Sequence, residues 1–227
     1  MPSIIKIPRN PGQLVNYVSR ARAEYRRRLP HFQPDGEYLF VTWRLHGSLP
    51  AEPADIVYAT PGHAFVAQDR ALNQQRGALW LSDPRVARHV ADTIRDGERQ
   101  LGFYESQAWV IMPNHVHLLI LPQVALSKIT HWIKGRTARE ANHLLGRAGV
   151  PFWQHESYDH WVRSQKELNR IIGYIEENPV SAGLAATPED CPGQAPQGQA
   201  KACPAIPIGR IIGLVPVAIL TYRSPFP

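Results

Sequence analysis

Cysteine is almost missing from this sequence, with two residues in 227, Cys191 and Cys203. Both lie in one Pro- and Gly-rich segment, where they provide neither a disulfide framework nor a four-cysteine zinc site. This excludes the disulfide-stabilised folds of small secreted proteins, so a cytoplasmic protein is the expectation.

Long hydrophobic runs are missing as well. No stretch approaches the roughly 20 apolar residues that a membrane-spanning helix needs. Residues 1–6 lack the apolar segment of a secretory signal. The sequence therefore predicts no membrane partner.

The composition is that of a globular protein, with 44% hydrophobic and 19% charged residues. Its changes divide the chain into a basic N-terminal extension (1–35), a main domain (36–184) and a Pro/Gly-rich linker with a C-terminal tail (185–227). The net charge of +6 and the pI of about 9.5 favour a polyanionic partner, most often a nucleic acid.

The N-terminal extension and the C-terminal tail, here called the appendages, each contain a segment that allows two interpretations. Arg26, Arg27 and Arg28 end a basic cluster, which is either the solvated end of a helix or an arm that contacts phosphates. In the tail, the apolar residues 206–220 are either a docked strand or an interaction segment.

An apolar stretch from Trp109 to Pro122 dominates the main domain and has the length and composition of one strand. Side chains alternate along a strand, so His115 and His117 point the same way. Two imidazoles on one face form half of a metal site, or a hydrogen-bonded pair on a half-buried sheet. Their spacing alone leaves both interpretations open.

Hydrophobic periodicity predicts a strand over 38–45 and helices over 69–75, 83–99, 127–145 and 164–178. Asp83 and Pro84 are typical of the start of the second helix. Ser164 and Glu167 form a capping box at the start of the last one. Pro179 is expected to end that last helix.

One side of the helix predicted over 127–145 is basic and carries an aromatic ring. A single-stranded nucleic acid could bind there, with cations on phosphates and a ring on a base. The alternative is a solvated face with one half-buried Trp. The basic flank consists of Lys128, Trp132, Arg136 and Arg139.

The last helix presents Tyr174 and Asn178 on one face, since they are four residues apart. Singly, they are a packing residue and a helix terminator. Together with the histidines they provide what phosphodiester cleavage needs, which is metal ligands and a nucleophile. Tyr158 is the rival nucleophile, but only the helix of Tyr174 also presents an amide.

These motifs resemble those of a known enzyme family. Residues 112–119, M-P-N-H-V-H-L-L, resemble the HUH strand (histidine, hydrophobic, histidine) of single-tyrosine transposases. Residues 174–184, Y-I-E-E-N-P-V-S-A-G-L, resemble the C-terminal signature of the REP-associated tyrosine transposases. The second motif is specific, whereas the first alone is weak.

The resemblance implies an α+β, ferredoxin-like (RRM-like) sandwich with a central antiparallel sheet and helices on one or both faces. It implies an enzyme in which His115, His117 and Asn178 bind Mg²⁺ or Mn²⁺ and Tyr174 forms a covalent 5′-phosphotyrosine. The implied substrate is single-stranded DNA with hairpins, and the location is the nucleoid. Family members often form homodimers, so a site shared between subunits is one expectation.

Two other functions are consistent with the sequence. The first is a domesticated relative that binds structured single strands without cutting them, although a binder has no need of all four site residues. The second is a zinc hydrolase built on His-x-His, which the apolar residues after His117 disfavour.

Overall fold

The computed structural model describes residues 21–26, 30–50, 61–186 and 220–223. Arg27, Arg28, both cysteines and residues 206–219 lie outside this part of the chain. The strands are β1 (Ala21–Arg26), β2 (Pro30–Pro34), β3 (Leu39–Arg44), β4 (Tyr104–Ile111), β5 (His115–Pro122), β6 (Tyr158–Trp161) and β7 (Leu220–Arg223). The α-helices are α2 (Pro61–Asn73), α3 (Pro84–Arg99), α4 (Leu126–Leu144) and α5 (Gln165–Ser181), with a short 3₁₀ helix at Trp80–Ser82.

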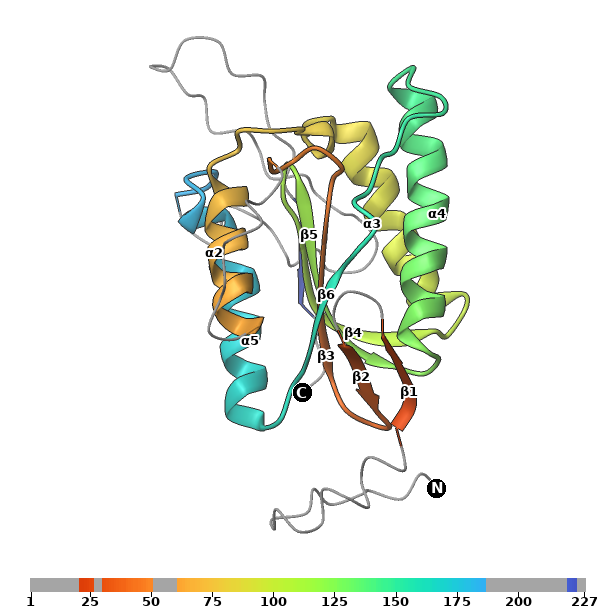
Figure 1. Ribbon diagram of the computed structural model, residues 1–227, viewed down its shortest axis with the longest axis vertical. Coiled ribbons are helices and arrows are strands. Elements are labelled where there is room, and N and C mark those ends of the chain that lie inside the picture. The colour runs from red at the N-terminus through yellow and green to blue at the C-terminus, as the bar shows by residue number, and fades with distance from the viewer. Residues whose placement is uncertain (1–20, 27–29, 51–60, 187–219, 224–227) are drawn as a thin grey trace.

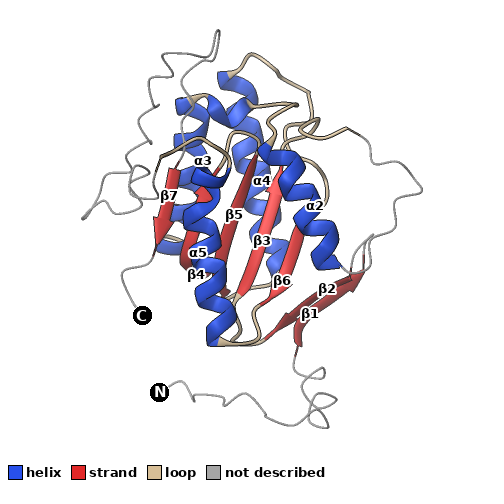
Figure 2. Cartoon of the chain, turned by 90° about the vertical axis from the view of Figure 1, so that its left-hand side faces the viewer, coloured by secondary structure: helices blue, strands red, loops and turns tan. Residues whose placement is uncertain are grey.

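The main sheet has the strand order β6-β3-β5-β4-β7, and all its neighbours are antiparallel. The order of elements from β3 through α3, β4, β5 and α4 to β6 is the βαββαβ arrangement of a ferredoxin-like sandwich. The predicted fold is therefore confirmed, and helices cover both faces of the sheet (Figures 1 and 2). No described helix is long and apolar enough to cross a membrane.

Each face of the sheet has its own core. Helices α3 and α4 cover one face, where Trp43, Trp109 and Leu118 are buried. Helix α5 covers the other, where Phe40 and Leu119 are buried. Alternation along β5 puts its two histidines on the α5 face, and Figure 2 shows α2 on that face as well.

The stretch from Trp109 to Pro122 is a hairpin, so the interpretation as one strand was wrong. Strand β4 ends at Ile111 and β5 begins at His115. Pro113 lies in the turn, which is closed by a 2.9 Å hydrogen bond from the Met112 N–H to the His115 carbonyl. Proline cannot donate to a sheet ladder, which explains why the chain reverses here.

The predictions of α3, α4 and α5 are largely confirmed. Asp83 caps α3, and the Ser164 hydroxyl accepts from the Glu167 N–H at the start of α5. Pro179, however, lies inside α5 instead of ending it. The helix ends two residues later, where Gly183 adopts a φ of +68° and the Leu184 N–H donates to the Pro179 carbonyl.

The appendages contribute strands. Residues 21–26 form β1, paired with β2, so the interpretation of this basic segment as a helix end was wrong. Gln33 in β2 accepts a 2.7 Å hydrogen bond from the Leu126 N–H at the start of α4. At the other end of the chain, β7 pairs with the edge of β4.

Candidate functional site

The two histidines of β5 form the centre of the candidate site. Both side chains are fully buried, and their Nε2 atoms lie 3.0 Å apart. The remaining ring nitrogens have partners: His115 Nδ1 lies 2.6 Å from Asn114 Oδ1, and His117 Nδ1 lies 2.7 Å from Thr42 Oγ1. Both Nε2 atoms are thus turned toward the same point.

Asn114 fixes the tautomer of His115. Its amide nitrogen donates a 2.8 Å hydrogen bond to the Leu72 carbonyl, so its Oδ1 faces the imidazole. His115 Nδ1 must then donate, which leaves Nε2 with a free lone pair, the state that binds a metal. Burial and the neighbouring His117 lower the pKa of His115 to about 3, which keeps the ring neutral.

Helix α5 adds the phenol and the amide that the sequence predicted beside the histidines. The Tyr174 hydroxyl lies 3.4 Å and Asn178 Nδ2 lies 3.3 Å from His117 Nε2. Asn178 is 1% exposed, whereas Tyr174 is half-buried. All four residues belong to one chain, so their meeting needs no second subunit.

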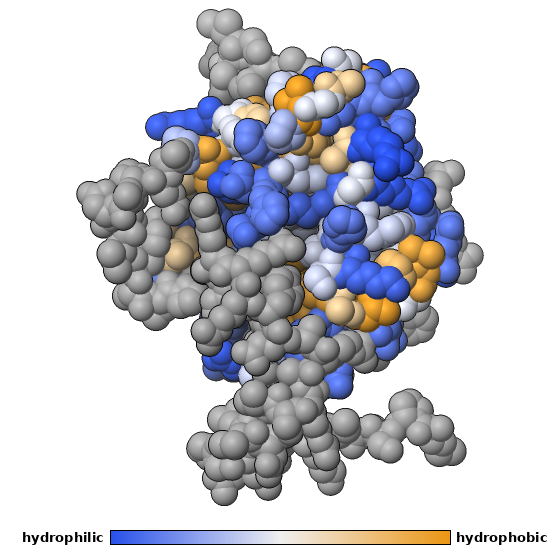
Figure 3. Space-filling model, turned by 45° about the vertical axis from the view of Figure 1, so that its right-hand side comes forward, coloured by the Kyte–Doolittle hydropathy of each residue, from blue (hydrophilic) through white to orange (hydrophobic). Residues whose placement is uncertain are grey.

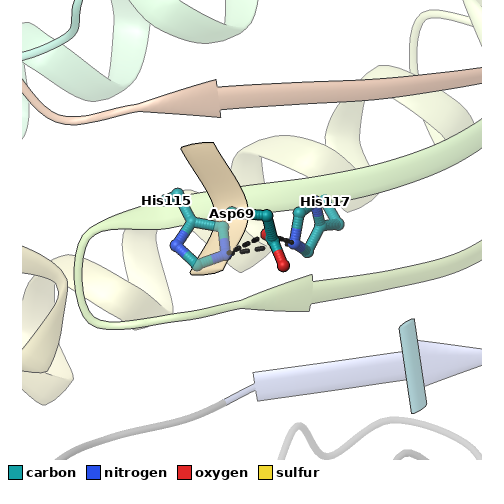
Figure 4. Close-up of side chains that lie close together, drawn as sticks. All are labelled: Asp69, His115 and His117. Atoms are coloured by element: carbon teal, nitrogen blue, oxygen red, sulfur yellow. Dashed lines mark hydrogen bonds and ion pairs between the residues drawn. The ribbon is translucent and has the colours of Figure 1, made fainter. Parts of the chain in front are cut away.

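The structure adds a residue that the sequence prediction missed. Asp69 of α2 lies between the imidazoles, with Oδ1 3.2 Å from His117 Nε2 and 3.7 Å from His115 Nε2 (Figure 4). Phe65 and Leu72 share its helix face, since they lie four positions before and three after it. A carboxylate on such an apolar face was the available signal, but α2 is only weakly amphipathic. The predicted helix over 69–75 was misplaced, because α2 spans Pro61–Asn73.

The electrostatics of the site favour a cation. Burial raises the pKa of Asp69, but the contact with His117 and the electrostatic interaction with both imidazoles outweigh burial and leave the pKa lowered. Burial raises the pKa of Tyr174, and the negative charge of Asp69 raises it further. The site therefore holds a carboxylate together with a phenol that resists ionisation.

Two buried oxygens fit a metal ion. Asn178 Oδ1 has no hydrogen-bond partner, and Asp69 Oδ1 has no neighbour with good hydrogen-bond geometry although His117 Nε2 lies 3.2 Å away. Buried polar atoms without a partner are costly, so unpartnered oxygens on two residues beside the histidines indicate a missing ligand. Asp69, His115 and His117 are a candidate site for a divalent cation, because one ligand atom of each lies within 4.8 Å of the others.

Comparison with known proteins supports the resemblance inferred from the motifs. Residues 75–178 match the model of a family described as "Transposase IS200 like". A REP-associated tyrosine transposase of Escherichia coli (strain K12) is 25% identical over 122 residues, which are 53% of this chain and 69% of that protein. Over residues 75–178 this chain is similar to the IS200-like tyrosine transposases. The predicted recognition and enzyme class are therefore confirmed.

A solved structure of a REP-associated tyrosine transposase bound to a REP hairpin is also similar to this chain. The two chains are 22% identical, with a TM-score of 0.43, and the similarity covers 84% of this chain and 99% of the other.

The rival nucleophile of this transposase-like chain lies next to the site. Tyr158 stacks on Phe65 with ring centroids 4.5 Å apart, and Phe65 in turn meets His117 at 6.2 Å. One aromatic ring therefore stands between Tyr158 and the histidine pair, whereas the Tyr174 hydroxyl contacts His117 directly.

The basic flank lies on the opposite face of the sheet from the histidines. Trp132 packs against Phe103, and the Lys128 ammonium lies 4.8 Å from the Phe103 ring centre. Arg136 contacts Trp132 and pairs with Asp96 at 3.1 Å. Arg139 is exposed, and hydrophilic residues predominate on this side (Figure 3).

Proposed function

We propose that this IS200-like transposase relative cuts and rejoins one strand of structured, hairpin-forming DNA, with Tyr174 as the nucleophile. The observation that supports this most is the 3.4 Å contact between the Tyr174 hydroxyl and His117 Nε2. It joins a phenol to a pair of buried imidazoles that have no other evident use. The substrate class follows from the family resemblance and from the basic charge of the chain.

In the proposed reaction the Tyr174 oxygen attacks the scissile phosphorus. The bond from phosphorus to the 3′ oxygen breaks and the 5′-phosphate stays on Tyr174. The phenol releases its proton and the 3′ oxygen takes one up, so no net proton is consumed. Attack by another 3′-OH reverses these steps and joins the strands. The covalent intermediate conserves the energy of the broken bond.

His115, His117 and Asn178 are the proposed ligands of a divalent cation, Mg²⁺ or Mn²⁺. When bound, the cation would polarise the phosphate and offset its negative charge. The raised pKa of Tyr174, which burial and Asp69 cause, means that the phenol keeps its proton at neutral pH. Nearby positive charge would lower this pKa and help the hydroxyl to react.

The rest of the chain has proposed roles around this centre. Residues 36–184 would be the unit that carries out the chemistry. They lie between the extension (1–35) and the tail (185–227). We propose that the basic flank of α4 contacts a part of the DNA away from the cut phosphate, since it lies on the other face of the sheet. Because its proposed substrate is DNA, we also propose that the enzyme is cytoplasmic and nucleoid-associated.

The test is a covalent adduct assay. The full chain is incubated with a labelled single-stranded hairpin oligonucleotide and Mn²⁺ or Mg²⁺, then run on a denaturing gel. We expect a protein–DNA adduct that EDTA prevents and that Tyr174→Phe abolishes. Tyr158→Phe is the matched control, because it removes a neighbouring phenol hydroxyl and should leave the adduct.

Two results would reject this assignment. An adduct that survives Tyr174→Phe and disappears in Tyr158→Phe would identify the rival nucleophile. Tight hairpin binding by the wild-type chain without any adduct would favour the alternative function, a binder that does not cut.

A further inference from the structure

Asp69 reaches the histidine pair from outside the segment that matches the family model. That segment begins at residue 75, whereas Asp69 belongs to α2, which spans Pro61–Asn73. Asp69 is buried, with 7% of its surface exposed. A buried carboxylate persists only where cations or hydrogen-bond donors compensate it, so the role of Asp69 must be found among its immediate neighbours.

Helix α2 is fixed against the site by two residues, Phe65 and Leu72. Phe65 packs edge-on against both His117 and Tyr174, with ring centroids 6.2 Å away in each case. Leu72 is 1% exposed, and its carbonyl accepts the hydrogen bond from Asn114. Asp69 lies between these two anchors on the same helix face, so its carboxylate is held in place by packing.

Four donor atoms from three elements converge here. The two Nε2 atoms lie 3.0 Å apart, which is about the separation of two adjacent ligands that each lie about 2.1 Å from one ion. Asp69 Oδ1 lies 3.2 Å from the nearer of them and has no neighbour with good hydrogen-bond geometry. Asn178 is also close, and a half-turn of its amide exchanges its unpaired Oδ1 with the Nδ2 that now faces His117.

We propose that Asp69 is a fourth, anionic ligand of the divalent cation, and that it joins helix α2 to the metal centre. This rests on the proposed metal site of His115, His117 and Asn178. A carboxylate changes the chemistry of that site, because it leaves one net positive charge on the ion–ligand group where neutral ligands alone would leave two. Two nitrogen and two oxygen donors suit Mn²⁺, which accepts both types.

The test is Mn²⁺ binding by the full chain, followed as the electron paramagnetic resonance signal of the free ion. Asp69→Asn keeps the shape of the side chain and removes its charge. We expect it to weaken Mn²⁺ binding by about tenfold or more, because affinity follows the number of charged ligands. Asp92→Asn, at an exposed site on α3, makes the same change in net charge and should bind Mn²⁺ as the wild type does.

The outcomes separate this inference from the proposed function. Equal or tighter Mn²⁺ binding by Asp69→Asn would overturn the inference and show that Asp69 is only a counter-ion for the histidines, while the adduct assay could still succeed. Failure of the wild-type chain to bind Mn²⁺ would overturn both the inference and the metal dependence. Normal Mn²⁺ binding without any adduct would overturn only the proposed function.

A second measurement needs no variant at Asp69. If the ion joins α2 to β5, Mn²⁺ should slow amide hydrogen exchange in residues 61–73 of the wild-type chain and leave α3 unchanged. His117→Ala should abolish this protection. Unchanged exchange in α2 at saturating Mn²⁺ would contradict the proposal even if Asp69→Asn failed to fold.

Discussion

His115 illustrates what burial costs an ionisable side chain. The ring is fully buried, and its pKa falls from 6.5 to about 3 because burial and the neighbouring His117 disfavour the charged form. The fold therefore keeps this imidazole neutral, ready to bind a cation, over a range in which an exposed histidine would be protonated.

The stability of the metal-free protein should consequently depend on pH. The unfolded chain binds a proton at His115 near pH 6.5, whereas the folded chain does so only near pH 3. Below about pH 6 this histidine should lower the free energy of unfolding by about 1.4 kcal/mol for each pH unit of acidification. Urea denaturation in EDTA at pH 7, 6 and 5 measures this slope.

His115→Gln is the control for that slope. It removes the titrating ring, so its free energy of unfolding should fall less steeply between pH 6 and 5 than that of the wild type. Parallel pH profiles for the two proteins would mean that His115 is protonated in the folded state. Asp69 does not disturb this comparison, because its lowered pKa confines its titration to more acid pH.

At the scale of elements, the two helices of the α3–α4 layer each contain a glycine, in opposite surroundings. A Cβ on Gly97 would lie 2.6 Å from the Tyr104 hydroxyl oxygen and 3.0 Å from the Trp132 ring. That hydroxyl donates a 2.6 Å hydrogen bond to the Ile94 carbonyl, so Tyr104 cannot move away freely. Gly135 of α4 has nothing within 4 Å of such a Cβ.

Alanine should therefore have opposite effects at these two positions. Gly97→Ala should lower the free energy of unfolding by about 1–3 kcal/mol, because overpacking between α3 and β4 outweighs the better helix propensity. Gly135→Ala should raise it by about 0.5–1 kcal/mol. Chemical denaturation of the two variants measures both, and effects of the same sign would contradict the packing described here.

For the whole molecule, the candidate site is the place where three separated elements meet. Asp69 comes from α2, the histidines from β5, and Tyr174 with Asn178 from α5. An ion held among them would bind the folded state and leave the unfolded chain largely unbound. It should therefore stabilise the protein as a whole.

Metal removal should then lower the melting temperature. At a Mn²⁺ concentration 100 times the Kd, the gain is about 2.7 kcal/mol, or about 5–10 °C for a chain of this size, and EDTA should reverse it. Differential scanning calorimetry measures this shift. His117→Ala should show no Mn²⁺ effect, whereas His131→Ala, at an exposed position on α4, should behave as the wild type does. An equal Mn²⁺ effect in all three proteins would place the ion elsewhere.

The sequence by itself determined the local parts of this protein. Alternation put His115 and His117 on one face, helical spacing put Tyr174 beside Asn178, and the capping residues fixed where α3 and α5 begin. These features depend on neighbours within a few positions, so a pattern in the chain is enough to predict them.

Only the tertiary structure decided what surrounds those parts. Pro113 turned one predicted strand into a hairpin, and the face of the sheet separated the basic flank from the histidines. Asp69 lies beside the two histidines although it comes 46 to 48 positions earlier in the chain. Its helix has weak hydrophobic periodicity, which gave little indication of this contact. Such contacts depend on how elements pack, and spacing along the chain does not encode packing over such distances.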